Sequence, residues 1–574
     1  MDTIEDYSVS DRKGLVRVAR KKEPPDVFFQ GGHILNVFTG ELLPRGMAVK
    51  NGRIACLPKE TDPYVKLSPE VYDLEGSILV PGFIDAHVHI ESSMLTPAQF
   101  ASAVLTRGTT AVVYDPHEIA NVLGVPGVEW MVKDIGRAPL KGFLAIPSCV
   151  PASGEGLETS GASFGPQEIK KLSSLPEAIA LGEMMNYPGV LDEDEGVFEF
   201  LTLAAESELN LEGHASGLTG TDLSAYSAAG IDSDHEAAAK DESIQRVRRG
   251  MWTYIREGSG WRDLEQVIRP ITEEGVSSRR FCLVTDDRDP VDLLEEGGMD
   301  HVVRRAVEEG LSPIQAIQMA TLNPAQRFGL DGNLGSLSPG RVADFSILNS
   351  LDELRIERTF VEGRPQDELQ WSGSTDEGVR GTVDLGRSIE EMDFDIGHFT
   401  GSYGIGVHEN SIMTDLVDID ESANPEVLTR CAVIERHRGS GRIGRALIDG
   451  FGLQEGAVGS TVAHDSHNLI VLGVSPGDMV KAANHLRQLG GGIVVVRDET
   501  VQAQVELPVA GLMAPFPPSQ VAESLEALHS AIRSLGVELS RPVMTISSLA
   551  LPVIPEARVT DKGLVDVKKG RVID

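Results

Sequence analysis

The stretch Val80-Pro-Gly-Phe-Ile-Asp-Ala-His-Val-His-Ile-Glu-Ser-Ser-Met94 decides how the rest of this chain is interpreted. The apolar run from Ser77 to Ile84 predicts a buried strand that ends in Asp85, His87 and His89. Because side chains alternate across a strand, His87 and His89 project to the same side. Two imidazoles on one face at the end of a strand can hold a metal ion, although the same triplet is also found at ordinary polar strand ends. The metal interpretation therefore depends on the remaining sequence.

The composition is typical of a soluble globular protein with two or three domains, since the chain has 574 residues, 41% of them hydrophobic and 24% charged. No apolar run reaches transmembrane length and the first residues contain no signal-peptide core, which predicts a cytoplasmic protein. A net charge of -36 argues against nucleic acid or an anionic membrane as partner. The four cysteines form no CxxC motif, which is typical of reduced, unpaired thiols.

A small β domain is predicted from the sequence on both sides of the central region. Residues 1–25 form a charged arm, and residues 26–77 alternate short apolar runs with turn signals, among which Asn51-Gly52 is a strong hairpin signal. Short β character returns in residues 335–385, which end in a polar, Gly-rich linker. We expect these two flanks to build one β-sandwich together.

The central region, residues 78–334, contains eight strand-like runs, most of them separated by enough chain for a helix. Buried strands that alternate with helices predict a (β/α)8 TIM-type barrel, whose chemistry lies at the C-terminal ends of its strands. A doubly wound open sheet is the alternative, but no GxGxxG or P-loop motif supports it. Residues 386–574 alternate strands and helices again and predict a separate α+β domain. The eight runs are ILVPGFIDAHVHI, TTAVVYDP, GFLAIPSCVP, AIALGEMMNY, LNLEGHASG, GIDSDHE, MWTYIRE and RRFCLVTDD.

Five of the eight runs end in residues that can ligate a metal. Together they supply four imidazoles and two carboxylates, a mixed nitrogen and oxygen set suited to Zn, Mn or Fe(II). Six groups are too many for one tetrahedral ion with an open position, but they fit two ions that share a bridging carboxylate and a hydroxide. Each residue alone has an ordinary structural explanation, and only their joint placement favours a binuclear metal site. The six residues are His87, His89, Glu183, His214, His235 and Asp286.

Further motifs lie along nearly the whole chain from about residue 25. The broad ones are PGFIDAHVH and GSLSPGRVADFSIL, and with them the chain resembles the amidohydrolase superfamily. Within that superfamily it resembles the adenine deaminase family, in which Glu183 stands where many other members carry a carboxylated lysine. The narrower motifs are IESSMLTP, DPHEIANVLG, PSCVPA, GEMMNYPGV, EGHASGL, IREGS, TDDRDP, GFGLQEGAVGSTVAHDSHNLIVLG and LPVAGLM.

This resemblance implies hydrolysis of adenine to hypoxanthine and ammonia by a hydroxide activated at a binuclear centre. It implies two divalent ions, Mn(II) or Fe(II) with Zn(II) as a further candidate, and a homo-oligomer is expected. By position, one ion would be held by His87, His89 and Asp286. The other would be held by His214 and His235, with Glu183 as the bridge. Asp286, bound to a metal and facing the nucleophile, is the natural proton shuttle to the departing ammonia.

Several residues have roles that the sequence leaves open. Glu118 in DPHE and Glu257 in IREGS are candidates for the general acid that protonates a ring nitrogen, and Arg256 could orient the base; structural ion pairs are the alternative. His464 and His467 in AHDSHN do not share a strand face. Their loop either closes over the barrel mouth and contacts substrate or is purely structural. Cys149 in PSCVP is interpreted as a packing residue.

Two other functions compete with deamination of adenine. A dihydroorotase-like hydrolase of cyclic amides would use the same scaffold, because fold and metal site do not fix the substrate. The motifs of the last region argue against it. A metal-free scaffold for protein assembly would have lost ligands, and none of the six is lost.

Overall fold

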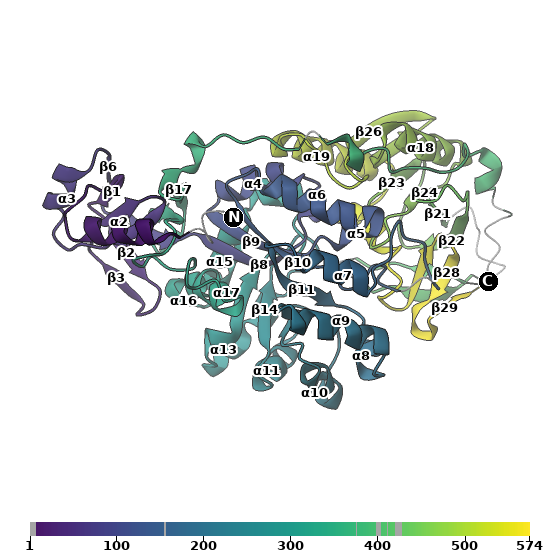
Figure 1. The fold of residues 1–574 in the computed structure, drawn as a ribbon. Coiled ribbons are helices and arrows are strands. Elements are labelled where there is room, and N and C mark those ends of the chain that lie inside the picture. Colours follow the sequence, from purple (N-terminus) through teal and green to yellow (C-terminus); the bar gives the residue numbers. More distant parts are fainter. Residues whose placement is uncertain are drawn as a thin grey trace.

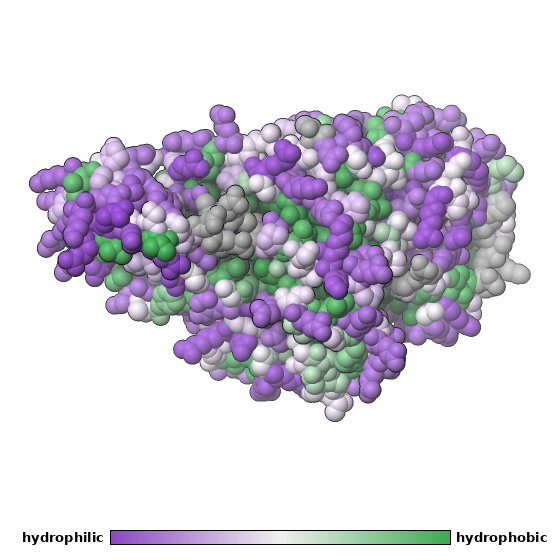
Figure 2. Space-filling model, in the orientation of Figure 1, coloured by the Kyte–Doolittle hydropathy of each residue, from purple (hydrophilic) through white to green (hydrophobic). Residues whose placement is uncertain are grey.

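The structure is a computed structural model that describes residues 7–573 except 154–155, 375, 396, 398–402, 410, 412 and 420–427. Figure 1 shows a barrel in the middle of the molecule, with the N-terminal strands at one end and the C-terminal third at the other. The face in Figure 2 is largely hydrophilic, with hydrophobic residues in scattered patches. Within the described ranges, no helix is both long and apolar enough to cross a membrane.

Eight parallel strands form the barrel, in a five-stranded sheet and a three-stranded sheet. One seam closes where the Asp286 N–H donates to the His87 carbonyl (3.1 Å) and the His89 N–H donates to the Asp286 carbonyl (3.2 Å). At the other seam the Gly213 N–H donates to Ser233 Oγ (3.0 Å). These bonds confirm the predicted α/β TIM-type domain. The strands are β8 (Phe83–Val88), β9 (Thr109–Tyr114), β10 (Lys141–Ile146), β11 (Ala178–Met184), β12 (Asn210–Gly213), β13 (Ser233–Asp234), β14 (Trp252–Arg256) and β15 (Phe281–Val284).

Helices cover the outside of the barrel (Figure 1). In α15, Met299, Val302, Val303 and Ala306 are buried, and this three- and four-residue spacing places them on the face toward the strands. The helices are α4 (Pro97–Leu105), α5 (His117–Leu123), α6 (Val125–Ile135), α7 (Pro166–Leu172), α8 (Tyr187–Leu191), α9 (Glu195–Glu206), α10 (Gly220–Ala228), α11 (Lys240–Arg248), α12 (Leu264–Val267), α13 (Arg269–Glu274), α14 (Pro290–Glu295), α15 (Met299–Glu308), α16 (Pro313–Met319) and α17 (Leu322–Arg327).

The apolar run before the first histidines differs from the prediction of a single strand from Ser77 to Ile84. It forms two strands, because β7 (Ile78–Pro81) pairs with strands of a flanking sheet while β8 begins the barrel. The chain changes sheets at Gly82, where a Cβ atom would lie 2.1 Å from Thr110 Oγ1. Glycine therefore permits the close approach that the sheet change requires.

The flanking strands form a four-stranded sheet and a six-stranded sheet, and the six-stranded one joins strands from before and after the barrel. Phe29 and Phe345, one from each flank, meet edge to face with ring centroids 5.0 Å apart. The hairpin predicted at Asn51-Gly52 is confirmed, and both residues have positive φ angles. The elements are α2 (Val9–Ala19), β1 (Val27–Gln30), β2 (His33–Asn36), β3 (Glu41–Leu43), β4 (Met47–Lys50), β5 (Arg53–Cys56), α3 (Asp62–Leu67), β6 (Val71–Asp73), β16 (Phe345–Leu348), β17 (Ile356–Val361) and β18 (Arg364–Pro365).

The described part of the C-terminal third contains an eight-stranded sheet, a three-stranded sheet and three α-helices. It joins the barrel through main-chain bonds, since the Ala514 N–H donates to the Met94 carbonyl (2.8 Å) and the Thr96 N–H donates to the Ala514 carbonyl (3.1 Å). The elements are β19 (Tyr403–Gly406), β20 (Asp415–Asp418), β21 (Thr429–Ile434), β22 (Ile443–Asp449), β23 (Ala457–Ser460), β24 (Leu469–Gly473), α18 (Pro476–Leu489), β25 (Gly492–Arg497), β26 (Thr500–Glu506), α19 (Pro518–Ser534), α20 (Pro542–Ser548), β27 (Ala557–Thr560), β28 (Gly563–Asp566) and β29 (Arg571–Ile573).

Candidate metal centre

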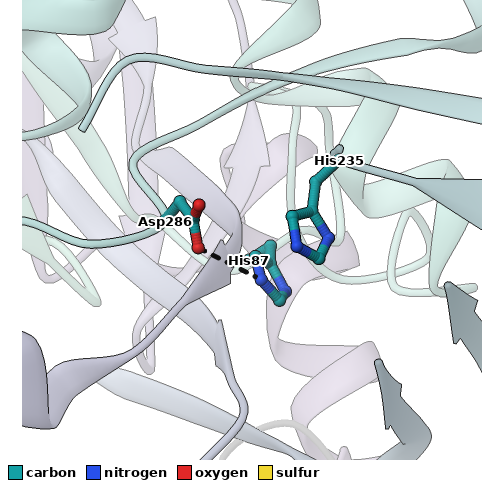
Figure 3. Close-up of side chains that lie close together, drawn as sticks. All are labelled: His87, His235 and Asp286. Carbon is teal, nitrogen blue, oxygen red and sulfur yellow. Dashed lines mark ion pairs between the residues drawn. The ribbon is translucent and has the colours of Figure 1, made fainter. Parts of the chain in front are cut away.

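The six residues predicted as ligands lie together at the C-terminal mouth of the barrel. His87 and His235 stack with their ring centroids 4.1 Å apart, and His87 Nε2 lies 3.5 Å from Asp286 Oδ1 (Figure 3). His89 Nε2 lies 3.3 Å from the same oxygen. All of the side chains are buried except that of His214, which is 20% exposed.

Glu183 is the central member of this cluster. Its Oε1 atom lies 3.4 Å from His89 Nε2, whereas its Oε2 atom lies 2.6 Å from His214 Nδ1 and 3.1 Å from His235 Nε2. The Glu183 N–H donates to Asp115 Oδ2 (3.0 Å), which fixes the backbone behind the side chain. The two carboxylate oxygens therefore face two different groups of imidazoles.

The hydrogen bonds behind His89 select the tautomer that a metal ligand needs. Its Nδ1 atom is 3.0 Å from the Asp115 carbonyl, and because a carbonyl only accepts, Nδ1 carries the proton. His89 Nε2 therefore points into the cluster, where, against burial, Asp286 and Glu183 raise the pKa of this imidazole well above its ordinary value. A bound cation would displace the Nε2 proton and take its lone pair. His87 Nε2 is buried and has no hydrogen-bond partner among the described residues, so a cation there would satisfy it.

The charge states also suit metal ligation. Burial, reinforced by His235, lowers the pKa of His87 to about 4, so that this imidazole is neutral at pH 7. Although burial opposes it, the neighbouring histidines hold the pKa of Glu183 well below its ordinary value, and they do the same for Asp286. Although burial opposes it, Glu183 raises the pKa of His235 to about 9, so this imidazole carries a proton at pH 7. A bound cation would displace that proton.

Three overlapping trios in the cluster have ligand atoms within 4.8 Å of one another, so each could hold an ion. Two of the trios share Glu183, and imidazole nitrogens with carboxylate oxygens are a donor set that divalent transition metals accept. The residues therefore fit a pair of divalent cations. The trios are His87–His89–Glu183, Glu183–His214–His235 and His87–His235–Asp286.

Arg256 and Glu236 form the polar edge of the cluster. Arg256 Nη1 lies 3.2 Å from Asp286 Oδ2 and contacts Glu236, while Arg256 Nε donates to Asp263 (2.7 Å). Glu236 Oε1 is 3.6 Å from His235 Nε2. Glu236 was not predicted as a site residue, although its position directly after His235 was a usable signal.

His117 connects the cluster to the C-terminal third of the chain and was also missed. Its Nδ1 atom lies 3.7 Å from Glu183 Oε1, and its Nε2 atom lies 3.8 Å from Asp465 Oδ1. His117 precedes Glu118 in DPHE and Asp465 follows His464 in AHDSHN, so both stood inside motifs that were already singled out. Their mutual contact could not be predicted from the sequence, because it joins distant segments.

The loop that contains His464 and His467 lies against Glu118, at the start of α5. His464 Nδ1 lies 3.4 Å from Glu118 Oε1, and His467 Nε2 lies 3.8 Å from Glu118 Oε2. The Ala463 N–H donates to His467 Nδ1 (3.2 Å), so the proton of the neutral ring is on Nε2 and faces Glu118. The structure therefore brings Glu118 and this histidine pair together, beside the six candidate ligands.

The structure does not bring Glu257 to the cluster. Its Oε1 atom lies 3.7 Å from Arg305 Nε of the outer helix α15, on the side of the strand opposite to Arg256. Cys149 is buried, and burial raises the pKa of its thiol to about 11. The thiol is therefore protonated at neutral pH, in agreement with a packing role.

Two protein families match the chain. Residues 78–366 match the amidohydrolase family, and residues 409–571 match the adenine deaminase C-terminal domain. An adenine deaminase from Moorella thermoacetica is 44% identical over 98% of this chain and 97% of its own length. Adenine deaminases from Paracoccus denitrificans and Archaeoglobus fulgidus are each 41% identical, over 98% and 99% of this chain and 97% and 98% of their own lengths. Because these relatives match over almost the full length of the chain, the chain belongs to the adenine deaminases, a family with an amidohydrolase barrel.

Proposed function

We propose that this chain hydrolyses free adenine to hypoxanthine and ammonia at the mouth of the barrel. The adenine deaminases that match its full length support this activity, and so does the amidohydrolase barrel. The observation that carries the choice of site is the division of the Glu183 carboxylate between two sets of imidazoles. A carboxylate shared in this way suits a bridge between two cations.

The six clustered residues would hold two divalent ions. His87, His89 and Asp286 would ligate one, His214 and His235 the other, and Glu183 both. When bound, two such cations supply the Lewis acidity that makes hydroxide available near neutral pH. Mn(II) or Fe(II) suits the mixed donor set, with Zn(II) as a further candidate.

Asp286 would move the proton of the reaction. Its Oδ1 atom faces His87 and His89, and its Oδ2 atom receives Arg256 Nη1 at 3.2 Å, so the carboxylate is held in one orientation. In this position Asp286 would accept a proton from the attacking water and deliver it to the amino group that leaves carbon 6 of adenine as ammonia. Arg256 would orient Asp286 rather than the purine, because three carboxylates already surround its guanidinium.

Glu118 would serve the ring nitrogen that must be protonated as carbon 6 becomes tetrahedral. It lies beside the cluster and contacts both histidines of the C-terminal loop, whereas Glu257 pairs with Arg305 away from the mouth. The C-terminal loop would then take part in substrate binding through His464 and His467. This arrangement favours the enzymatic role over the purely structural one for that loop.

We also propose the domain organisation that the sequence suggests. It comprises an arm (1–25), a β-sandwich built from residues 26–77 and 335–385, the barrel (78–334) and a C-terminal α+β domain (386–574). The six-stranded sheet with strands from both flanks supports the shared sandwich. A homo-oligomer and a cytoplasmic location stay predictions from the sequence.

A substrate panel tests the proposed function. Enzyme reconstituted with Mn(II) should release ammonia from adenine, far more slowly from adenosine, and essentially not from cytosine. A site built on hydrogen bonds to the ring rejects bases that cannot make them by roughly 10⁴-fold. No ammonia from adenine together with hydrolysis of dihydroorotate would transfer the assignment to the cyclic amide hydrolases.

A further inference from the structure

A cavity of about 210 Å³ lies between the barrel and the C-terminal third of the chain. Its barrel wall comes from η1 (Ile90–Ser93) and the start of α14, and its other wall comes from α19, α20 and the loop after β23. A water molecule occupies about 30 Å³ in the liquid, so this volume suits several waters or one small ring system.

The inner end of the cavity is next to the residues that would act on the substrate. Ser92 and His464 both line the cavity and both approach Glu118, at 3.2 and 3.4 Å. Ser92 Oγ also donates to Asp287 Oδ1 (2.5 Å), the residue that follows Asp286. The His464 N–H donates to the Ser547 carbonyl of α20 (3.0 Å), which holds this part of the wall in place.

Glu91, which also lines this cavity, has one buried oxygen without a hydrogen-bond partner among the described residues. Glu91 is 2% exposed, and while its Oε1 atom accepts the Ile119 N–H (3.3 Å), its Oε2 atom has no hydrogen-bond partner among the described residues. Burial of an unpaired carboxyl oxygen costs free energy that a ligand could offset. The lining also has an apolar part, with Val291, Leu525 and Met544.

The charge of the lining selects among purine ligands. The carboxylates of Asp289 and Asp292 border the cavity, against a single guanidinium, that of Arg541, which already lies 3.9 Å from Asp292. Glu91 adds little to this charge, because burial raises the pKa of its carboxyl to about 8. A phosphate would be repelled by this excess of negative charge. A neutral heteroaromatic base, with apolar faces and polar edges, matches an apolar cavity with a polar inner end.

We propose that this cavity is the access and holding site through which a neutral purine base reaches the metal centre. The inference rests on the proposed deamination of adenine and adds its route and a reason for the exclusion of nucleotides. A base that waits here contacts Ser92 and His464, which lie against Glu118. Ser92 leads on to Asp287, whose carboxylate lies with His89 and Asp286. The competing route would pass His214, the partly exposed member of the cluster.

Met544 offers the sharpest test because it crosses the cavity. A Cβ atom added at Gly260 of the barrel would lie 3.3 Å from Met544 Cε, so this side chain already reaches the opposite wall. Met544→Trp should lower kcat/KM for adenine at least about tenfold while metal content and the circular dichroism spectrum stay unchanged. Val291→Trp narrows the cavity from the other wall and replaces the first variant if that one does not fold. Met392→Trp, at a residue that is 67% exposed, is the matched control.

A labelling experiment measures whether a base occupies the cavity, and it does not depend on turnover. In Met544→Cys, hypoxanthine should slow modification of the new thiol by a small methanethiosulfonate reagent, and the same concentration of AMP should not. The wild type supplies the background from Cys56, the native cysteine that is not fully buried. Unchanged kcat/KM in the tryptophan variants, or no protection by hypoxanthine, would overturn the cavity as the route and favour the path past His214. Wild-type enzyme that releases no ammonia from adenine would instead contradict the proposed function.

Discussion

Two histidine pairs stand near the barrel mouth, and their hydrogen bonds prepare them for different tasks. In the pair at the end of β8, His89 donates its Nδ1 proton to the Asp115 carbonyl, so that its Nε2 atom faces the carboxylates. In the pair on the C-terminal loop, His467 Nδ1 accepts the Ala463 N–H, so that a proton on Nε2 faces Glu118. One imidazole is therefore prepared to bind a cation and the other to donate a hydrogen bond.

The difference lies in the backbone group behind each ring rather than in the residue type. A carbonyl behind Nδ1 makes a ligand, and an N–H behind Nδ1 makes a donor. The group Glu118, His464 and His467 has ligand atoms close enough to hold an ion, yet the tautomer of His467 argues against one. We therefore expect different consequences of mutation at the two pairs. Metal should be lost only when residues of the cluster at the end of β8 are substituted.

The largest effect is expected at Glu183. Glu183→Gln keeps the shape of the side chain but removes the charge that two cations would share, and the loss of several kcal/mol of stabilisation corresponds to roughly 10³-fold or more in kcat/KM. Metal content, measured by elemental analysis, should fall below two ions per chain. Glu206→Gln, at an exposed carboxylate at the end of α9, should change neither quantity. Retention of two ions with near-normal turnover would show that Glu183 is not the bridge.

Asp286 should show the next largest effect, and mainly on the chemical step. Asp286→Asn removes the proton shuttle, and general acid–base groups contribute about 10²–10⁴-fold, so kcat should fall by that order while hypoxanthine still binds. Steady-state kinetics and a binding titration separate the two quantities. Equal losses in kcat and in affinity would make Asp286 a ligand only.

Much of this arrangement was predictable from local sequence, and the exceptions have a common cause. All eight strand runs form strands, because buried parallel strands are nearly continuous apolar runs such as Thr109–Tyr114. The clustering of the six candidate ligands was predictable because strand ends in a barrel converge. His117 and Asp465 were missed because their contact depends on how the C-terminal third docks on the barrel, which no local pattern encodes. The break at Gly82 was missed because apolar character continues across it.

Substitution of Glu118 should lower activity more than substitution of either histidine that contacts it. Glu118→Gln retains hydrogen bonding but cannot protonate the ring, and kcat should fall about 10²-fold, the lower end of general acid catalysis. Because Glu118 belongs to the second histidine group, metal content should stay at the wild-type level. Metal loss in this variant would remove the distinction between the two histidine pairs.

His467 should have a moderate effect on substrate binding. Its Nε2–H faces Glu118 at 3.8 Å and has no hydrogen-bond partner among the described residues, so it would donate to the substrate. One such hydrogen bond is worth about 0.5–1.5 kcal/mol, so His467→Ala should raise KM by roughly threefold to tenfold. Both metal ions should remain, as measured by elemental analysis. His485→Ala, at a histidine on α18 that bonds Gln504, is a control for loss of an imidazole elsewhere in this part of the chain. An unchanged kcat/KM would assign the loop a structural role.

Substitution of Glu257 should have the smallest effect on activity, because this carboxylate points away from the barrel mouth whereas Glu118 lies beside it. Both are carboxylates next to barrel strand ends, and both are buried, yet Glu257 lies 3.7 Å from Arg305 on the outer helix while Arg256 beside it faces Asp286. Alternation along the strand sends one of these neighbours to the mouth and the other to the helix layer. Glu257→Gln removes one partly exposed ion pair, worth about 0–1 kcal/mol, so the melting temperature should fall slightly and kcat/KM should change less than about threefold. A loss as large as that of Glu118→Gln, at unchanged stability, would show that Glu257 reaches the substrate after all and that it, rather than Glu118, protonates the ring.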